Sequence, residues 1–138
     1  MRIEVSGQGK LSKAKAEAIE RVTRRVDAAR RLFITPIAGQ EMIYLGKEAE
    51  ARAYLSAEPE PVDLTDYPFI ASEVGVTAPD AHGVAQVYLN LATQWRGIGS
   101  ALEGIRLSAG ANINSSTSLN MISAAESAAL DAIEALLP

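Results

Sequence analysis

A long stretch with helical periodicity, residues 80–113, constrains the fold more than any other feature of this sequence. Its apolar residues recur at steps of three and four, which is the spacing of one helix face and not of a strand. The segment Thr77-Ala-Pro-Asp80 has the spacing of a capping box, with a proline near the first turn. We therefore expect one helix of about 50 Å. Its apolar face comprises Val84, Val87, Leu91, Trp95, Ile98, Leu102, Ile105, Ala109 and Ile113, and we expect Trp95, Ile98, Leu102 and Ile105 to anchor the core.

A second face of the same segment carries only small residues: Gly97, Ala101, Gly104, Ser108 and Ala111. Each glycine inside a helix costs about 1 kcal/mol relative to alanine. The close approach of another helix is the usual compensation for that cost. We therefore predict that Gly97, Ala101 and Gly104 contact a neighbouring helix or a second copy of the chain.

Composition favours helices over strands. Hydrophobic residues make up 48% of the chain but aromatic residues only 5%, because alanine supplies much of the apolar content. The absence of cysteine excludes disulfides and thiolate metal sites. The sequence has no run of about 18 apolar residues, so no membrane span is expected.

Charge is distributed unevenly. The segment Lys10–Arg31 has eight basic and three acidic residues, a net charge of +5, and the chain from Leu32 onward has a net charge of −9. A basic arm for nucleic acid is one interpretation. A solvated helix face is favoured, because acid-before-base pairs recur at i,i+4 and no aromatic residue lies among the bases to stack on nucleotides. In a third interpretation, the basic helix packs against the acidic remainder of its own chain or of a neighbouring chain. The i,i+4 pairs are Glu17/Arg21, Glu20/Arg24 and Asp27/Arg31.

The N-terminal part predicts a strand followed by a helix. Arg2–Val5 alternates polar and apolar residues before a turn at residues 6–9. Ile3 and Val5 could therefore add a strand to the sheet edge of a partner, and a frayed terminus is the alternative. A helix is expected over Leu11–Ile34, with a narrow seam suited to a helix hairpin or a coiled coil. The seam consists of Ile19, Val22, Val26, Ala29 and Phe33.

The remaining segments complete an all-α fold. Thr35-Pro36 ends the first helix and starts a second, which runs through Leu55. An acidic, proline-rich linker follows at 58–65, then a short helix, Tyr67–Val74, capped by Asp66 and ended by Gly75. A polar turn at 114–118 leads into a last helix, Leu119–Leu137. We expect antiparallel helical hairpins around the long helix in the C-terminal half, with a short N-terminal strand, and a division into an arm (1–34) and a helical domain (35–138).

No group of residues carries the signature of catalysis, a metal or a cofactor. His82 is the only histidine and has no ligand partners at a suitable spacing. Gly7-Gln-Gly9-Lys10 lacks the spacer and the Ser/Thr of a phosphate loop. Tyr44, Tyr54, Tyr67 and Trp95 have the helical spacing of core or interface anchors. The sequence therefore predicts a protein that is not an enzyme.

Several segments resemble the small accessory proteins of the tails and tail fibres of bacteriophages and prophages. The resemblance covers residues 30–137 and leaves most of the first helix outside. Its residues are Phe33-Ile-Thr-Pro36, Gly39-Gln40-Glu41, Tyr44, Lys47-Glu-Ala49, Ala51, Asp66-Tyr-Pro68, Glu73-Val-Gly75, Val84-Ala85, Trp95, Ile98, Leu102-Glu103 and Arg106.

The resemblance implies a structural component of a phage tail, attached at the fibre or baseplate region. It carries over no active site and no cofactor. The alternatives are a tail-fibre assembly chaperone and a small helical nucleic-acid-binding protein that uses residues 10–31. The expected partners are other tail or fibre proteins and further copies of this chain, with three copies suiting a symmetric fibre. The expected location is the tail of the virion, after synthesis in the host cytoplasm.

Overall fold

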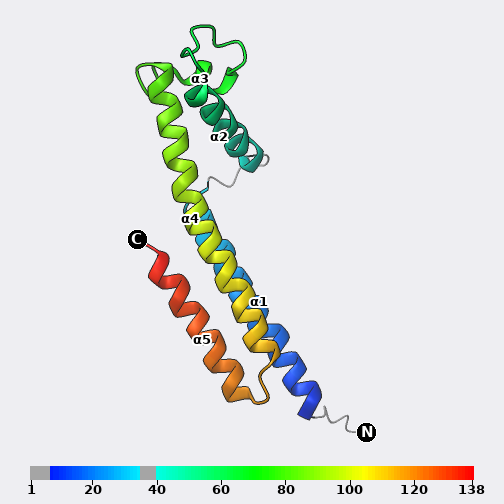
Figure 1. The fold of residues 1–138 in the computed structure, drawn as a ribbon. Coiled ribbons are helices and arrows are strands. Elements are labelled where there is room, and N and C mark those ends of the chain that lie inside the picture. Colours follow the sequence, from blue (N-terminus) through cyan, green and yellow to red (C-terminus); the bar gives the residue numbers. More distant parts are fainter. Residues whose placement is uncertain (1–6, 35–39) are drawn as a thin grey trace. The chain divides into compact units, whose positions relative to one another are not determined.

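Five α-helices form the described part of the chain, which covers residues 7–34 and 40–138 of a computed structural model (Figure 1). The expected all-α class with one long helix is confirmed. Within those residues the only β pairing is an isolated bridge between Val74 and Ala78. The helices are α1 (Gly7–Arg31), α2 (Gln40–Ser56), α3 (Pro68–Glu73), α4 (Ala81–Asn114) and α5 (Leu119–Leu136).

The described helices form two compact units, which divide α4 between Gly97 and Ile98. The α1/α5 unit contains α1, α5 and the second half of α4. The α2/α3 unit contains α2, α3 and the first half of α4. The expected division at residue 34 concerns independent folding of the two parts of the chain, and it stays a prediction.

Helix α4 has 34 residues, and its bounds differ by one residue at each end from the predicted 80–113. Its N-terminal cap is Asp80, whose Oδ1 accepts a hydrogen bond from the backbone N–H of Gly83 at 2.7 Å. Thr77, which the capping-box spacing favoured, instead donates its hydroxyl hydrogen to Glu73 at 2.5 Å. The cap is therefore three residues closer to the helix than expected, where a side-chain oxygen can reach the third N–H of the helix.

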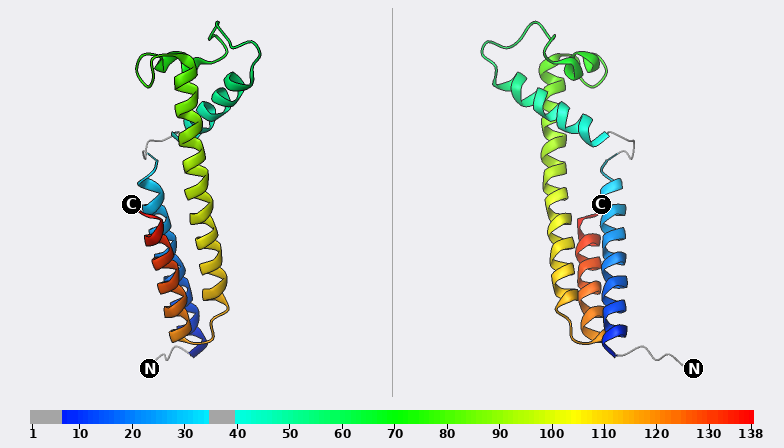
Figure 2. Two further views of the ribbon diagram at one scale, coloured as in Figure 1. Left: turned by 60° about the vertical axis from the view of Figure 1, so that its left-hand side comes forward. Right: turned by 90° about the vertical axis from the view of Figure 1, so that its right-hand side faces the viewer.

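The α1/α5 unit is a bundle of three helix segments that lie side by side (Figure 2). Helix α1 begins at Gly7, so the turn predicted at residues 6–9 is wrong for residues 7–9, which are helical. A helix tolerates glycine in its first turn, where the N–H groups have no intrahelical partner in any case. The buried core contains Ala18, Val22, Val26 and Ala29 of α1, Leu102, Ala109 and Ile113 of α4, and Ile122, Ala129 and Ile133 of α5.

The turn between α4 and α5 is polar, as expected. Ser118 is the N-cap of α5, and its side chain accepts a hydrogen bond from the N–H of Met121 at 3.1 Å. Ser116 is buried and donates its hydroxyl hydrogen to the carbonyl oxygen of Asn112 at 2.8 Å. These bonds hold the reversal of the chain direction that brings α5 back against α1 and α4.

In the α2/α3 unit, a side chain from α2 caps the short helix α3. The carboxylate of Glu50 accepts hydrogen bonds from the N–H groups of Phe69, at 3.0 Å, and Ile70, at 3.2 Å. The predicted cap at Asp66 is wrong: the N-cap position is Tyr67, with no side-chain cap of its own. Gly75 follows α3 with a φ of +84°, a conformation that suits glycine after a helix end. The buried core of this unit consists of Ala51, Tyr54, Ile70, Val84, Ala85 and Tyr88.

Candidate functional site

Basic side chains of α1 form ion pairs with acidic side chains of α5 in the same chain. Arg21 donates to both carboxylate oxygens of Glu126, at 2.5 and 2.8 Å, and this contact lowers the pKa of Glu126. Arg25 donates to Glu134 at 2.9 Å. Among the three interpretations of the basic segment, this geometry corresponds to docking on the acidic remainder of the chain.

Glu103 of α4 lies between two arginines. Arg106 donates to it at 2.5 and 3.0 Å, and Arg30 of α1 donates at 2.9 Å. The two hydrogen bonds from Arg106, followed by the one from Arg30, lower the pKa of Glu103 to about 2. The charged residues of this part of α4 are therefore directed toward α1.

The outer face of α1 is charged, and its ion pairs follow the i,i+4 rule with one change. Because Arg21 contacts Glu126, Glu17 pairs with Lys13 at 3.8 Å and not with Arg21. The side chains of Lys13 and Arg24 are 77% and 76% exposed. The other two predicted pairs form, Arg24–Glu20 at 2.5 Å and Arg31–Asp27 at 3.1 Å.

The predicted seam of α1 is only partly buried. Val22 and Val26 are buried, whereas Ile19 and Phe33 are half-buried and Phe33 lies beyond the end of the helix. Ala18, which the seam omitted, is fully buried. An alanine carries little apolar weight in a sequence pattern, although it can mark the position of closest helix packing.

The predicted core anchors of α4 differ in burial. Leu102 is fully buried, and Ile98 and Ile105 are partly buried against the same cluster. Trp95 is only half-buried, so it is not the fully buried core residue that the apolar period predicted. Leu91, on the same predicted face, is 56% exposed. Periodicity identifies the face of a helix but not how far along that face other elements cover it.

No part of the described chain packs closely on the predicted glycine contacts. Gly97 and Gly104 are exposed, and a Cβ atom added at either would meet nothing within 4 Å outside its own helix. Ala101 is half-buried. The intrachain packing described here therefore gives no reason for glycine at these two positions, and contact with another chain stays a prediction.

An open groove of about 350 Å³ lies between α4 and α5, next to Gly104. All of its lining residues are uncharged, and most are alanine, glycine or serine. On α5, the nearby acid Asp131 does not belong to the lining. The lining comprises Ala101, Gly104, Ile105, Ser108, Ala109 and Asn112 of α4, and Ala125, Ala128, Ala129 and Ala132 of α5.

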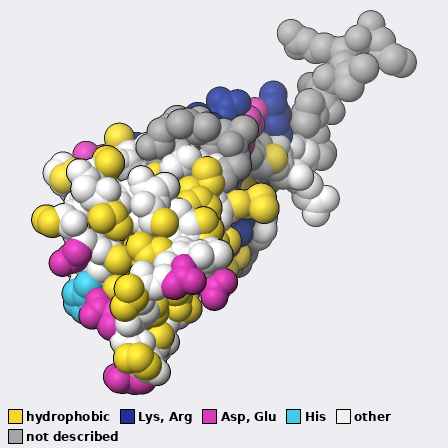
Figure 3. Space-filling model, turned by 90° about the horizontal axis from the view of Figure 1, so that it is seen from above, with side chains coloured by type: hydrophobic (Ala, Val, Ile, Leu, Met, Phe, Trp, Pro, Cys, Tyr) yellow, Lys and Arg dark blue, Asp and Glu magenta, His cyan; other side chains and the backbone are white. Residues whose placement is uncertain are grey.

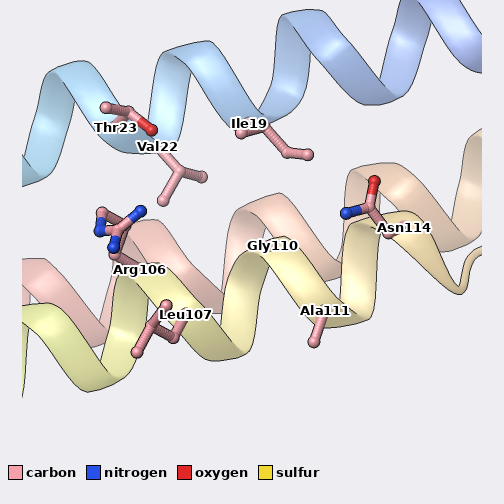
Figure 4. A pocket seen from close by; sticks show the side chains of 8 residues that line it. All are labelled: Ile19, Val22, Thr23, Arg106, Leu107, Gly110, Ala111 and Asn114. Carbon is pink, nitrogen blue, oxygen red and sulfur yellow. The ribbon is translucent and has the colours of Figure 1, made fainter.

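A second groove, of about 270 Å³, lies between α1 and α4 (Figure 4). Its lining comes from Ile19, Val22 and Thr23 of α1 and from Arg106, Leu107, Gly110, Ala111 and Asn114 of α4. Leu107 is 57% exposed. This groove therefore differs from the α4/α5 groove, because its lining includes a charged residue, Arg106, and a large exposed apolar residue, Leu107.

The most deeply buried carboxylate of the α2/α3 unit is structural in character. Glu48 is 6% exposed and accepts hydrogen bonds from Arg96 at 2.7 and 2.8 Å and from Arg52 at 3.2 Å. The Arg96 contact, which outweighs the effect of burial, lowers the pKa of Glu48 to about 2. This ionised group joins α2 to α4 within the unit.

A second cluster surrounds Glu73 at the end of α3. Lys47 lies 2.8 Å from its carboxylate and 5.1 Å from the ring centre of Tyr88, while the hydroxyl groups of Tyr88 and Thr77 donate hydrogen bonds to it. Burial opposes ionisation of Glu73, but these three partners together lower its pKa. Burial and the neighbouring carboxylate of Glu73 raise the pKa of Tyr88. Tyr88 was absent from the predicted apolar face, although it lies four residues after Val84 and three before Leu91, because Val87 was assigned to that turn.

The third cluster fixes the proline-rich loop to α2. The hydroxyl of buried Tyr54 donates to Glu60 at 2.7 Å, and its ring packs edge to face on Tyr67, with centroids 5.4 Å apart. Burial, followed by the Glu60 contact, raises the pKa of Tyr54 to about 12. His82 Nδ1 lies 3.7 Å from Glu60. The hydrogen bond from Tyr54 to Glu60 therefore joins the loop to α2.

The end of the α2/α3 unit presents acidic and apolar side chains together (Figure 3). Val62 and Val76 are 95% and 83% exposed. In the residues that the structure describes, no group of three or more histidine, cysteine or acidic side chains is placed to hold a metal ion. Nor is any helix in that part of the chain long and apolar enough to cross a bilayer.

Ile3 and Val5, the residues predicted to add a strand to a partner, lie outside the described residues, as do Thr35 and Pro36.

No protein-family model, curated protein or solved structure matches this chain.

Proposed function

We propose that this chain is a non-enzymatic structural component of a bacteriophage tail, attached at the fibre or baseplate region through helix contacts with other chains. The proposal combines the sequence resemblance with one structural observation: the uncharged groove between α4 and α5, where Gly104 and its small neighbours are open. Small side chains let another backbone approach closely, so such a surface suits packing against protein.

The polar clusters support the same class of function. Glu48, Glu73 and Glu103 each accept hydrogen bonds from at least two partners. Carboxylates whose pKa is lowered and whose oxygens already accept hydrogen bonds are poor general acids or bases near neutral pH. These residues therefore support structural roles and supply no obvious chemistry.

Nucleic-acid binding receives less support from the geometry. Arg21, Arg25 and Arg30 are engaged by acids of α4 and α5. A nucleic acid would have to compete with these intrachain partners for most of the basic groups on that side of α1. The salt dependence of binding tests this alternative: binding to nucleic acid through residues 10–31 should fall steeply between low and moderate salt, and without that loss the alternative is rejected.

Mass spectrometry of purified particles tests the proposal. Particles from the genome that encodes this chain should contain it after density-gradient purification and a high-salt wash. A tail-fibre assembly chaperone would instead be found with free fibre protein in infected-cell extracts and be missing from finished particles. If the chain is found with free fibre protein and not in finished particles, it is an assembly chaperone and not a structural component.

A further inference from the structure

Charge is segregated between the two units of the described chain. From Ala53 to Trp95, in the α2/α3 unit, the sequence contains six acidic residues and no lysine or arginine. In the α1/α5 unit, residues 7–16 contain three lysines and no acidic residue, and residues 107–125 contain no charged residue. Two surfaces of opposite charge therefore lie in different units, and each of them also carries exposed apolar side chains.

The positive surface lies where α1 begins and where the chain turns from α4 into α5 (Figures 1 and 2). Lys15 Nζ donates a hydrogen bond to the carbonyl oxygen of Asn114 at 2.8 Å, which joins the start of α1 to that turn. Leu119 and Met121, in the first turn of α5, are 59% and 47% exposed. We call this surface the basic end, and it consists of Lys10, Lys13, Lys15, Leu119 and Met121.

The negative surface consists of the two loops on either side of α3, residues 57–66 and 74–80. The first loop is held by the hydrogen bond that Glu60 accepts from α2. Each loop presents an apolar side chain to solvent, since Val62 is 95% and Val76 83% exposed. We call this surface the acidic end, and it consists of these two valines and the exposed acids Glu58, Glu60, Asp63, Asp66 and Asp80.

We propose that copies of this chain associate head to tail, with the basic end of one copy bound to the acidic end of the next. The inference goes beyond the proposed function, because it names the two surfaces that meet and holds whether or not the chain belongs to a particle. Since the two surfaces differ, the contact is heterologous and builds chains or rings of copies.

Charge complementarity supports a copy of this chain as the partner. The basic end has three positive charges, of which Glu17 compensates one through its contact with Lys13 at 3.8 Å. The acidic end has five negative charges, and its nearest base is His82, 3.7 Å from Glu60. Opposite potentials favour the encounter of the two ends, whereas two basic ends or two acidic ends repel each other. Charge therefore favours head-to-tail contact over a pair formed through either end alone.

Positive charge elsewhere on the α1/α5 unit is already compensated. The five arginines of α1 each contact an acidic side chain, and Arg106 pairs with Glu103. Asp131 of α5 is exposed, but it lies twelve residues beyond Leu119, about 18 Å along the helix. Lys10 and Lys15, which form no ion pair within the described residues, therefore place the uncompensated positive charge of this unit at the basic end.

The exposed apolar side chains favour a protein surface over a free polyanion as the partner of the basic end. Contact between the two ends would remove Leu119 and Met121 from water together with Val62 and Val76, which adds a hydrophobic contribution to the attraction. Exposed ion pairs each contribute little and are screened by salt. The association should therefore be weak and should decrease as the salt concentration rises.

Sedimentation velocity of the full chain tests the contact. At about 50 mM NaCl the weight-average mass should rise above that of the monomer as the protein concentration increases, and at about 500 mM NaCl it should return toward the monomer. Reversing two charges at either end should weaken the association about tenfold. The two variants are Lys10→Glu/Lys13→Glu and Glu58→Lys/Asp66→Lys.

A chain that carries all four substitutions gives the sharpest test. Its net charge stays at −4, because two losses of positive charge offset two losses of negative charge, and the signs of both ends are exchanged. It should therefore associate like the unaltered chain. Arg24→Glu/Arg31→Glu is the matched control for the basic end, since it changes the net charge of the same helix equally but lies outside that end, and it should leave the association unchanged.

Circular dichroism checks the helix content of every variant. If the chain with four substitutions fails to fold, an equimolar mixture of the two double variants replaces it, because they should associate with each other more strongly than either does with itself. A chain that stays monomeric at low salt, an association unaffected by either double variant, or a reversal of both ends that restores nothing would overturn the inference. None of these experiments requires a particle, so the composition of particles decides the proposed function separately.

Discussion

Replacing Glu48 by glutamine should destabilise the α2/α3 unit measurably, although the change preserves size and shape. Glu48 is 6% exposed, and the contacts with Arg96 and Arg52 hold its pKa at about 2, against 4.5 for an ordinary glutamate. At about 1.4 kcal/mol per tenfold change in proton affinity, that difference corresponds to roughly 3 kcal/mol. The side chains of both arginines are more than half exposed, so solvent screens the interaction, and about 1–2 kcal/mol is the realistic expectation.

The pH dependence has a defined sign. Because the folded pKa of Glu48 lies below its unfolded value of 4.5, the carboxylate stabilises the fold fully above about pH 4.5, and this contribution is lost as the pH falls toward 2. Glu48→Gln should therefore lower the melting temperature by roughly 3–8 °C at pH 7. The difference between variant and unaltered chain should shrink by pH 3.

Fluorescence of Trp95, the only tryptophan, reports on unfolding of the unit that contains Glu48. Glu58→Gln is the control, because Glu58 is an exposed loop residue that also loses one negative charge. The reasoning fails if Glu48→Gln melts within a degree of the unaltered chain at pH 7. It also fails if the difference is the same at pH 7 and pH 3.

Substitution by alanine should have opposite effects on the melting temperature at two glycines. Gly104→Ala should raise it through a gain of about 1 kcal/mol in helix propensity. Gly46→Ala should lower it, because the added Cβ would lie 2.7 Å from the ring of Phe69. Thermal melts at low concentration give both signs, and equal signs would contradict the packing at one site. Glu50→Ala should remove the cap of α3, lower the stability by about 1 kcal/mol and speed hydrogen exchange at the amide of Phe69. An unchanged exchange rate at that amide would show that Glu50 does not cap α3. Trp95→Ala should cost about 1–3 kcal/mol by chemical denaturation, less than the 3–5 kcal/mol of a fully buried aromatic residue, and a larger loss would mean that Trp95 is a deep core residue after all.

Local patterns predicted the helices well because each helix has its own periodicity and end signals. The apolar repeat of 80–113 gave α4 to within one residue at each end. The polar turn and Ser118 located the start of α5. Gly75 marked the end of α3 because it has a positive φ, which glycine adopts more easily than other residues.

Contacts between distant segments were not predictable in the same way. The cap of α3 comes from Glu50, a residue of another helix, and no local pattern links the two. Arg21 has a partner available at i−4 in Glu17 but binds Glu126, which is far away in the sequence. The depth of Trp95 likewise depends on which elements cover one stretch of α4, and its helical period contains no information on that point.

The groove between α4 and α5 was only half visible in the sequence. The small residues of α4 indicated a packing surface, but they did not reveal that alanines of α5 would form its other wall. The groove therefore needs residues of both α4 and α5, and the sequence of α4 alone predicts only one of its two walls.

The copy number of this chain in purified particles is the most direct test of a structural role in a phage tail. Isotope-labelled peptides of this chain and of a major tail protein, added to washed particles in known amounts, give the ratio of the two proteins. A structural component should be present at a constant number of copies per particle across independent preparations and after repeated washing. Its absence, or a variable amount that falls with each wash, would contradict the assignment.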